Sequence, residues 1–216
     1  MIEMTAFKWV PAFAQGYVKD LRVRWALEEA GLAYQVRLID AEVARSGAYR
    51  AWQPFGQVPA YRDDDVSLFE SGAIVLHIAA KSPALAPPGV AGFSRAAAWV
   101  VAALNSVEPQ AQKFIELDAG AAGDGARARA LAALHARLAA LSTWLADSEY
   151  LEQGFGAGDL MMTSVLRELV DSGVLADFPL LDRYRLRCEA RPAFARSLQA
   201  QLQAFRDNAP AGADPA

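Results

Sequence analysis

The sequence predicts a protein of two parts: an α/β half built on a mixed sheet of four strands, followed by a half made only of helices. Three observations carry this prediction. Residues 5–81 show strand and helix patterns in the order β-α-β, loop, β-β-α. Residues 82–92, SPALAPPGVAG, are rich in proline, glycine and alanine, which is typical of a linker. From Phe93 onward the apolar residues recur at helical spacing, with no convincing strand pattern.

The first elements form a β-α-β unit. TAFKW, residues 5–9, is typical of a short strand, and DLRVRWALEEAGL, residues 20–32, of an amphipathic helix. Asp20 is the candidate N-cap of this helix, and Gly31 supplies its left-handed stop. AYQVRLID, residues 33–40, alternates as a strand does. Because the helix crosses over between the two strands, we expect them to be parallel.

A loop, a hairpin and a helix complete the first half. Residues 41–57 are polar and irregular and predict a loop. PAYR at 59–62 and VSLF at 66–69 flank DDD, which predicts an antiparallel hairpin. SGAIVLHIAAK, residues 71–81, predicts a helix. The expected result is a mixed sheet with helices on its faces.

The second half consists of predicted helices. Helical periodicity occurs in five segments, at residues 93–117, 126–146, 159–172, 180–189 and 193–205. The last ten residues, DNAPAGADPA, have too little apolar content to fold, so the sequence predicts a disordered tail. The predicted organisation is a first domain at 1–81, a linker at 82–92, a helical domain at 93–206 and a tail at 207–216.

The composition bounds the classes of function. Of the 216 residues, 54% are hydrophobic and 21% are charged, as in soluble proteins with a sizeable core. We expect no membrane partner, because no run approaches the ~18 apolar residues of a membrane span. The N-terminus lacks the basic start and apolar stretch of a secretory signal, so the sequence predicts a cytoplasmic protein. A net charge of -4 disfavours nucleic acid as a partner.

One cysteine limits the chemistry further. Cys188 stands alone, which excludes an internal disulfide, a CxxC redox pair and any multi-cysteine zinc site. Its helical spacing in RYRLRCEARPAF indicates a buried structural thiol. The two histidines, His77 and His135, are far apart in the sequence, so we expect no metal site.

Four segments carry a resemblance to a known family. QPFGQVPAY precedes the predicted hairpin and LFESGAI follows it, while YLEQGFGAGDLMMTSVL and DFPLLDRYRLRCEARPAF lie in the helical half. Together with the order of elements, they resemble a cytosolic glutathione S-transferase over nearly the whole chain. The resemblance implies a thioredoxin-like first domain that binds glutathione as co-substrate, an all-helical second domain, a homodimer and a role in detoxification.

The resemblance assigns glutathione binding to four residues. It implies that the Val58–Pro59 peptide bond is cis and that the Val58 backbone pairs with the cysteinyl part of glutathione. Glu70 and Ser71 match the pair that holds the γ-glutamyl end. A helix N-terminus and the Ser71 hydroxyl suit the α-carboxylate of the ligand, and Glu70 accepts from its ammonium group. An ordinary trans proline at an edge strand and a serine helix cap are the structural alternatives.

The resemblance also implies a capping box in the helical half. Family members usually begin a central helix with Ser or Thr and place Asp three residues later. Here Gly156 stands at the cap and Asp159 at the third helical position, so half of the box is expected. Glycine in place of serine at a cap costs only a few tenths of a kcal/mol. These residues are therefore interpreted as structural.

A transferase needs glutathione as the thiolate, because the thiolate is the nucleophile. A thiol with a pKa of about 8.5 is only about 3% ionised at pH 7, so a nearby donor has to lower that pKa by roughly two units. Family members use Tyr, Ser or Cys near the start of the first helix. Tyr17 falls at the serine position and is the candidate catalytic donor; packing at the helix entrance is its alternative. Gln15 is a weaker donor, and Cys188 lies too far away for a cysteine-type mechanism.

A hydrophobic electrophile is the expected second substrate, in a mainly apolar cleft between the two halves. Asn105 and Gln112 belong to NSVEPQAQ, which lies where the zeta class lines its cleft. Each candidate could instead pack in the core or face solvent. The candidate lining residues are Trp9, Phe13, Trp99, Asn105, Gln112 and Phe114.

The predicted function follows from these assignments. The protein is expected to add the glutathione thiolate to an electrophilic small molecule, or to use it to reduce a peroxide. The pattern is most similar to the serine-type and zeta classes, but their serine motif is absent. Two alternatives stay open: a zeta-like glutathione-dependent isomerase, and a non-catalytic binding or interaction protein suggested by the altered loop at 10–17.

Overall fold

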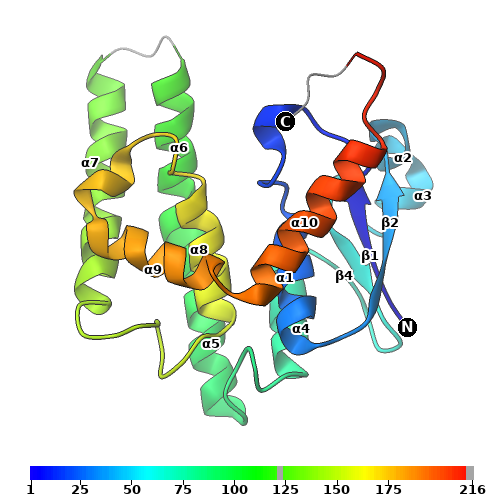
Figure 1. Ribbon diagram of the computed structural model, residues 1–216, viewed down its shortest axis with the longest axis horizontal. Coiled ribbons are helices and arrows are strands. Elements are labelled where there is room, and N and C mark those ends of the chain that lie inside the picture. Colours follow the sequence, from blue (N-terminus) through cyan, green and yellow to red (C-terminus); the bar gives the residue numbers. More distant parts are fainter. Residues whose placement is uncertain (121–123, 213–216) are drawn as a thin grey trace. The chain divides into compact units, whose positions relative to one another are not determined.

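The computed structural model describes residues 1–120 and 124–212 (Figure 1). The chain packs into two compact units. Met1–Ser82 and the chain from Pro192 onward form the first unit, and Pro83–Arg191 form the second. The last helix therefore belongs to the same unit as the sheet, although the sequence groups it with the helical segments. The predicted domain limits at 81 and 92 stay a prediction.

The first unit contains a mixed sheet of four strands in the order β2-β1-β3-β4. β1 and β2 are parallel, with Ile2 opposite Tyr34 at one end and Phe7 opposite Ile39 at the other. β3 runs antiparallel to both β1 and β4. This sheet confirms the predicted thioredoxin-like architecture. The strands are β1 (Ile2–Phe7), β2 (Tyr34–Ile39), β3 (Ala60–Arg62) and β4 (Ser67–Phe69).

Three helices support this sheet. α1 contacts both α4 and α10, and α10 lies beside α1 in Figure 1. Gly31 ends α1 in the left-handed conformation, with φ 65°, as predicted. The helices are α1 (Asp20–Ala30), α4 (Ser71–Ala80) and α10 (Pro192–Asp207), with a short 3₁₀ turn, η1 (Ala12–Ala14), before α1.

Two expectations about the first half are wrong. Residues 41–57, predicted as a loop, contain two short helices, α2 (Ala41–Arg45) and α3 (Gly47–Arg50). The side chains of Asp40 and Ser46 cap them by accepting the N–H groups of the third residue along. Asp20, predicted as the cap of α1, is its first helical residue, and Lys19 holds the cap position.

Asp20 instead joins α1 to α10. Its buried carboxylate accepts from Arg24 Nε at 2.7 Å and from Gln201 Nε2 at 2.7 Å. The same Gln201 amide donates to the carbonyl of Val18 at 3.1 Å. Burial raises the pKa of Asp20 in spite of the Arg24 charge, so the pairing offsets only part of the desolvation cost.

A second carboxylate, Asp63, ties the β3–β4 turn to α4. Its Oδ2 accepts from Lys81 Nζ at 2.7 Å and lies 2.8 Å from His77 Nε2. Its Oδ1 accepts the backbone N–H groups of Asp65 and Val66. Burial opposes ionisation, but these hydrogen bonds outweigh it and hold the pKa of Asp63 far below its usual range.

We expect Asp63→Asn to lower the free energy of unfolding by about 1.5 to 3 kcal/mol at pH 7, the range for hydrogen bonds to a charged group. Because the folded-state pKa lies below the unfolded-state value, this stabilisation is complete above that value and is lost as pH falls. Urea titrations from about pH 6 to about pH 3 should therefore show a smaller loss of stability for the variant than for the parent. Equal losses would show that Asp63 is not the linked group.

The second unit is helical, as predicted for the second half. α5 packs against α8, α6 packs against α7, and α8 packs against α9. The elements are α5 (Val90–Ala102), a π-helical turn η2 (Ala103–Val107), α6 (Glu108–Ala119), α7 (Asp124–Trp144), α8 (Ala157–Arg167), a 3₁₀ turn η3 (Val174–Asp177) and α9 (Pro179–Glu189). Part of the predicted tail, residues 213–216, lies outside the described residues.

One helical stretch meets a test for membrane spans that uses length and composition only. Val90–Ala119 is one helical stretch, and by length and composition it could cross a membrane, with a mean hydropathy of 1.3. The criterion is weak, because core helices of soluble proteins also meet it. Within its unit, the stretch packs against α7 and α8.

The start of α8 shows why Gly156 stands at its cap. Asp159 Oδ2 accepts the Gly156 N–H at 2.9 Å, so the predicted half of the capping box is confirmed. The Leu85 carbonyl accepts the Ala157 N–H at 2.7 Å. A Cβ on Gly156 would lie 2.9 Å from that same oxygen. The Leu85 carbonyl therefore satisfies the first N–H of α8 and occupies the space that a serine side chain at position 156 would need.

Cys188 is a buried structural thiol, as predicted. Its side chain on α9 is fully buried. Burial raises the pKa of the Cys188 thiol to about 12, so the thiolate is scarce at neutral pH.

Candidate functional site

A small pocket in the first unit joins segments that are far apart in the sequence. Its volume is about 30 Å³. The loop before β3 supplies one wall, and the N-terminus of α4 supplies the other. The lining residues are Lys19, Gln53, Gln57, Val58, Pro59, Glu70 and Ser71. Four of the predicted site residues, Val58, Pro59, Glu70 and Ser71, thus line one pocket.

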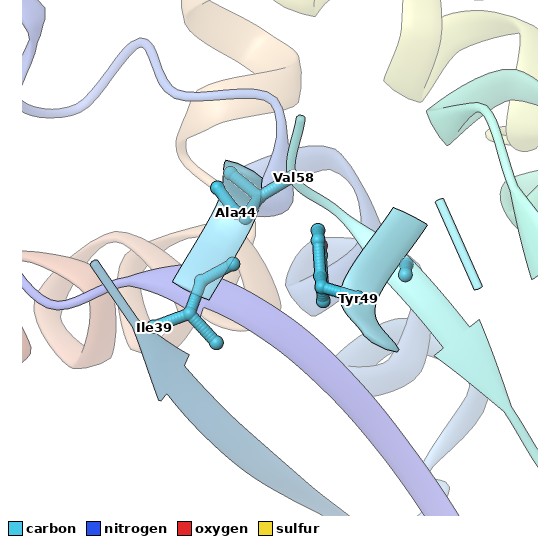
Figure 2. Packing of buried hydrophobic residues seen from close by; sticks show 5 residues of the cluster. Ile39, Ala44, Tyr49 and Val58 are labelled. Carbon is cyan, nitrogen blue, oxygen red and sulfur yellow. The ribbon is translucent and has the colours of Figure 1, made fainter. Parts of the chain in front are cut away.

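The Val58 side chain and backbone face different surroundings. The Val58–Pro59 peptide bond is cis, as the resemblance implied. The side chain packs in a hydrophobic cluster with Ile39, Ala44 and Tyr49 (Figure 2). Neither the N–H nor the C=O of Val58 bonds to any residue in the described part of the chain. Both backbone groups are therefore open to a ligand.

The loop before Val58 is held by its own hydrogen bonds. The Gln53 side-chain oxygen accepts the N–H groups of Phe55 at 2.7 Å and Gln57 at 3.2 Å. Gly56 adopts φ 65°, and a Cβ there would lie 2.7 Å from the Ala44 carbonyl oxygen. Glycine is needed at position 56 for two reasons. Other residues rarely adopt this φ, and any side chain would begin with a Cβ too close to the Ala44 carbonyl oxygen.

The N-terminus of α4 forms the other wall. Glu70 holds the cap position at φ 69°, and its side chain makes no capping hydrogen bond. A non-glycine residue at positive φ costs of order 1–3 kcal/mol and occurs most often at functional sites. Ser71 is the first helical residue, so the interpretation of Ser71 as the helix cap is wrong.

The first turn of α4 presents unpaired donors. Its first N–H groups have no partner within the helix. The Ser71 side chain is buried to 6% exposure, and its hydroxyl makes no hydrogen bond within the described residues. These N–H groups and the helix dipole favour an anion at this end.

Sequence reasoning missed three lining residues. Gln53 and Gln57 are part of QPFGQVPAY, so the motif that singled out Val58 already contained them. Lys19 precedes the α1 helix by one residue, and no motif marks it. Lys19 is the cation and Glu70 the anion among the lining residues, so the pocket offers a ligand one charge of each sign.

The structure does not bring Tyr17 into this pocket. Tyr17 lies between η1 and α1, two residues before Lys19, and its side chain is 37% exposed. The Gln15 side-chain amide donates to the Val10 carbonyl at 3.0 Å. Phe13, predicted for the cleft wall, is 84% exposed.

The other candidate cleft residues are spread over both units. Trp9 follows β1 in the first unit and is partly buried. Asn105 in η2 is exposed, and Gln112 in α6 donates to the buried Glu108 at 3.3 Å. Phe114 is 1% exposed and belongs to the core of the helical unit.

Trp99 lines a second, separate pocket of about 200 Å³ within the helical unit. Glu152 accepts from Trp99 Nε1 at 3.2 Å and from Arg95 Nε at 3.1 Å at the wall of this pocket.

The fold and the pocket together place the protein in a structural class. Its members have a thioredoxin-like domain in which a cis-proline loop and a helix N-terminus line one small pocket. Residues 8–80 match the family model described as the glutathione S-transferase N-terminal domain. Glutathione S-transferase P of Homo sapiens is 26% identical over 184 residues, covering 79% of this chain and 81% of that protein. Probable glutathione S-transferase GSTF1 of Oryza sativa is 44% identical over 62 residues. That match spans 28% of the rice protein and 28% of this chain.

Solved structures of glutathione transferases share the fold. One from Burkholderia graminis, with two glutathione molecules bound per subunit, has a TM-score of 0.77 at 24% identity, covering 92% of this chain and 88% of that one. One from Phanerochaete chrysosporium, in complex with oxidized glutathione, has a TM-score of 0.78 at 19% identity, covering 94% and 97%. Residues 8–80 therefore belong to the glutathione S-transferase N-terminal domain family, and nearly the whole chain shares the fold of the solved glutathione transferases.

Proposed function

We propose that the protein binds glutathione in the pocket between the Val58 loop and α4, holds it as the thiolate, and adds it to a hydrophobic electrophile or uses it to reduce a peroxide. One observation carries this proposal. The open backbone of Val58 and the open N-terminus of α4 line the same pocket. They suit two neighbouring parts of one tripeptide.

The Val58 backbone suits the middle of the tripeptide. An extended peptide pairs with a free backbone edge through one donor and one acceptor, as in strand addition. Val58 offers both, because its N–H and C=O bond to no described residue. The cysteinyl residue of glutathione carries the matching N–H and C=O groups.

The α4 end suits the γ-glutamyl group. The ligand's α-carboxylate would accept from the first N–H groups of α4 and from the Ser71 hydroxyl. Its ammonium group, on the same carbon, would donate to the Glu70 carboxylate. Lys19 adds positive charge to the same pocket, which suits a ligand whose net charge is negative.

The remaining parts of the proposal rest on the family resemblance. Tyr17 is proposed as the donor that activates the sulfur, and the electrophile is proposed to occupy an apolar cleft that includes Trp9, Phe13, Asn105 and Gln112. The protein is proposed to be a cytoplasmic homodimer with a role in detoxification and without a metal. The exposed ring pair of Phe55 and Phe69, with centroids 6.0 Å apart, offers an apolar surface for the second copy.

One observation favours a second candidate function, a binding protein without turnover. The pocket lining includes no Tyr, Ser or Cys from the segment before α1, where family members carry their sulfur-activating group. Calorimetry would measure glutathione binding, and activity assays would measure conjugation of a panel of electrophiles and peroxide reduction. Binding without either activity would favour this alternative.

We expect Glu70→Gln to weaken glutathione binding about tenfold, because a charge-assisted hydrogen bond to the ligand ammonium becomes a neutral one. Isothermal titration calorimetry with reduced glutathione measures the change. The matched control is Glu42→Gln on α2, an exposed glutamate outside the pocket, which should keep the parental affinity. An unchanged affinity in Glu70→Gln would contradict the γ-glutamyl assignment.

A further inference from the structure

Two buried hydroxyl groups behind the pocket link the two ends of the segment that carries Val58. The Ala60 N–H donates to Thr5 Oγ1 at 2.8 Å. The Tyr49 hydroxyl donates to the Gln57 carbonyl at 2.7 Å. The Thr5 and Tyr49 oxygens lie 2.8 Å apart. These contacts form one continuous chain of hydrogen bonds from Ala60 to Gln57, which we name the Thr5–Tyr49 relay.

The direction of each bond in the relay follows from the number of protons. A tyrosine hydroxyl has one proton, and the Tyr49 proton goes to the Gln57 carbonyl. Thr5 therefore donates to Tyr49 and accepts from Ala60. Each hydroxyl donates once and accepts once, so every member of the relay is satisfied.

The relay is rigid because it is buried. Thr5 on β1 is fully buried and Tyr49 on α3 is 4% exposed. Burial raises the pKa of Tyr49, so its hydroxyl stays protonated and keeps its role as a donor. The Tyr49 ring packs in the same cluster as the Val58 side chain (Figure 2).

We propose that the Thr5–Tyr49 relay positions the Val58 backbone for pairing with glutathione, so that Thr5 and Tyr49 are positioning residues of the site. Only Val58 and Pro59 lie between the two anchored residues, Gln57 and Ala60. The Gln57 carbonyl belongs to the peptide group that contains the Val58 N–H, and the Ala60 N–H belongs to the Pro59–Ala60 peptide group. Fixing both therefore holds the Val58–Pro59 peptide group, which carries the Val58 C=O, between two anchored peptide groups. This inference rests on the proposed binding of glutathione.

Thr5→Val tests the relay with almost no change in shape. It removes the acceptor of the Ala60 N–H and the donor to Tyr49, and we expect glutathione binding to weaken about tenfold. Thr5→Ser keeps the hydroxyl and should restore the parental affinity. Tyr49→Phe keeps the ring in its cluster, removes the donor to Gln57, and should weaken binding to a similar extent. In steady-state assays KM for glutathione should rise while kcat at saturation stays constant.

Double variants separate positioning from general damage. Thr5→Val and Tyr49→Phe interrupt the same relay, so the double variant should bind little more weakly than either single variant. Thr5→Val combined with Glu70→Gln affects two separate parts of the ligand, so the two fold-changes should multiply. The control is Tyr61→Phe, which removes a hydrogen bond to Asp63 away from the Val58 segment and should leave the affinity unchanged.

The outcomes distinguish this inference from the proposed function. If the parent protein does not bind glutathione, the proposed function fails. If the parent binds and Glu70→Gln weakens binding, while folded Thr5→Val and Tyr49→Phe keep the parental affinity, the relay only stabilises the fold and this inference is wrong. Circular dichroism of each variant establishes that it is folded at the temperature of the binding assay.

Discussion

Asp159→Ala is expected to lower the free energy of unfolding by about 3–5 kcal/mol, because it removes the acceptor of three hydrogen-bond donors. The Asp159 carboxylate accepts from the Leu151 N–H at 2.9 Å, the Gly156 N–H at 2.9 Å and the Tyr184 hydroxyl at 2.8 Å. Alanine removes the acceptor of the buried Leu151 N–H and the buried Tyr184 hydroxyl, and of the partly buried Gly156 N–H; each buried group left without a partner costs about 1–3 kcal/mol. Burial raises the pKa of Asp159, but the donors left behind determine the cost of removing it.

This loss is large compared with a typical stability of about 5–15 kcal/mol. It is measurable as a shift of the urea midpoint at pH 7. Asp171→Ala is the matched control, because Asp171 is an exposed aspartate of the same unit, and its loss should change stability by less than about 0.5 kcal/mol. Similar midpoints for the two variants would show that the Asp159 network contributes little.

The sequence predicted the regular elements well where periodicity is strong. The β-α-β start, the hairpin and the later helices all occur near the predicted positions. It failed at α2 and α3, because these helices are too short for a periodic pattern. They depend on the side-chain caps Asp40 and Ser46, which look like ordinary loop residues in a sequence.

The candidate site likewise contains some residues that the sequence could predict and others that it could not. Val58 and Glu70 stand in compact motifs that a sequence reader can recognise. Thr5 could not be found, because its partners Tyr49 and Ala60 lie 44 and 55 residues away, and only the folded sheet brings them together. Lys19 was missed for a similar reason, since its place in the pocket depends on how α1 packs beside the Val58 loop.

Tyr17→Phe is expected to lower conjugation at pH 7 roughly 25-fold while leaving the affinity for glutathione unchanged. If the Tyr17 hydroxyl lowers the pKa of the bound thiol by about two units, its loss takes the thiolate fraction from about three quarters to about 3%. The thiolate absorbs in the ultraviolet, so titrating the complex with pH gives the pKa of the bound thiol directly. Tyr34→Phe on β2 is the control for a lost tyrosine hydroxyl in the same unit.

Lys19→Met decides between the two groups that could hold the thiolate. Lys19 lines the pocket whereas Tyr17 does not, so the cation is the natural competitor of the hydroxyl. If Tyr17 is the donor, Tyr17→Phe raises the pKa of the bound thiol, and Lys19→Met mainly weakens binding, because it removes positive charge from a site for an anionic ligand. A pKa of the bound thiol that rises in Lys19→Met and stays constant in Tyr17→Phe would overturn the Tyr17 assignment. It would show that Lys19 stabilises the glutathione thiolate.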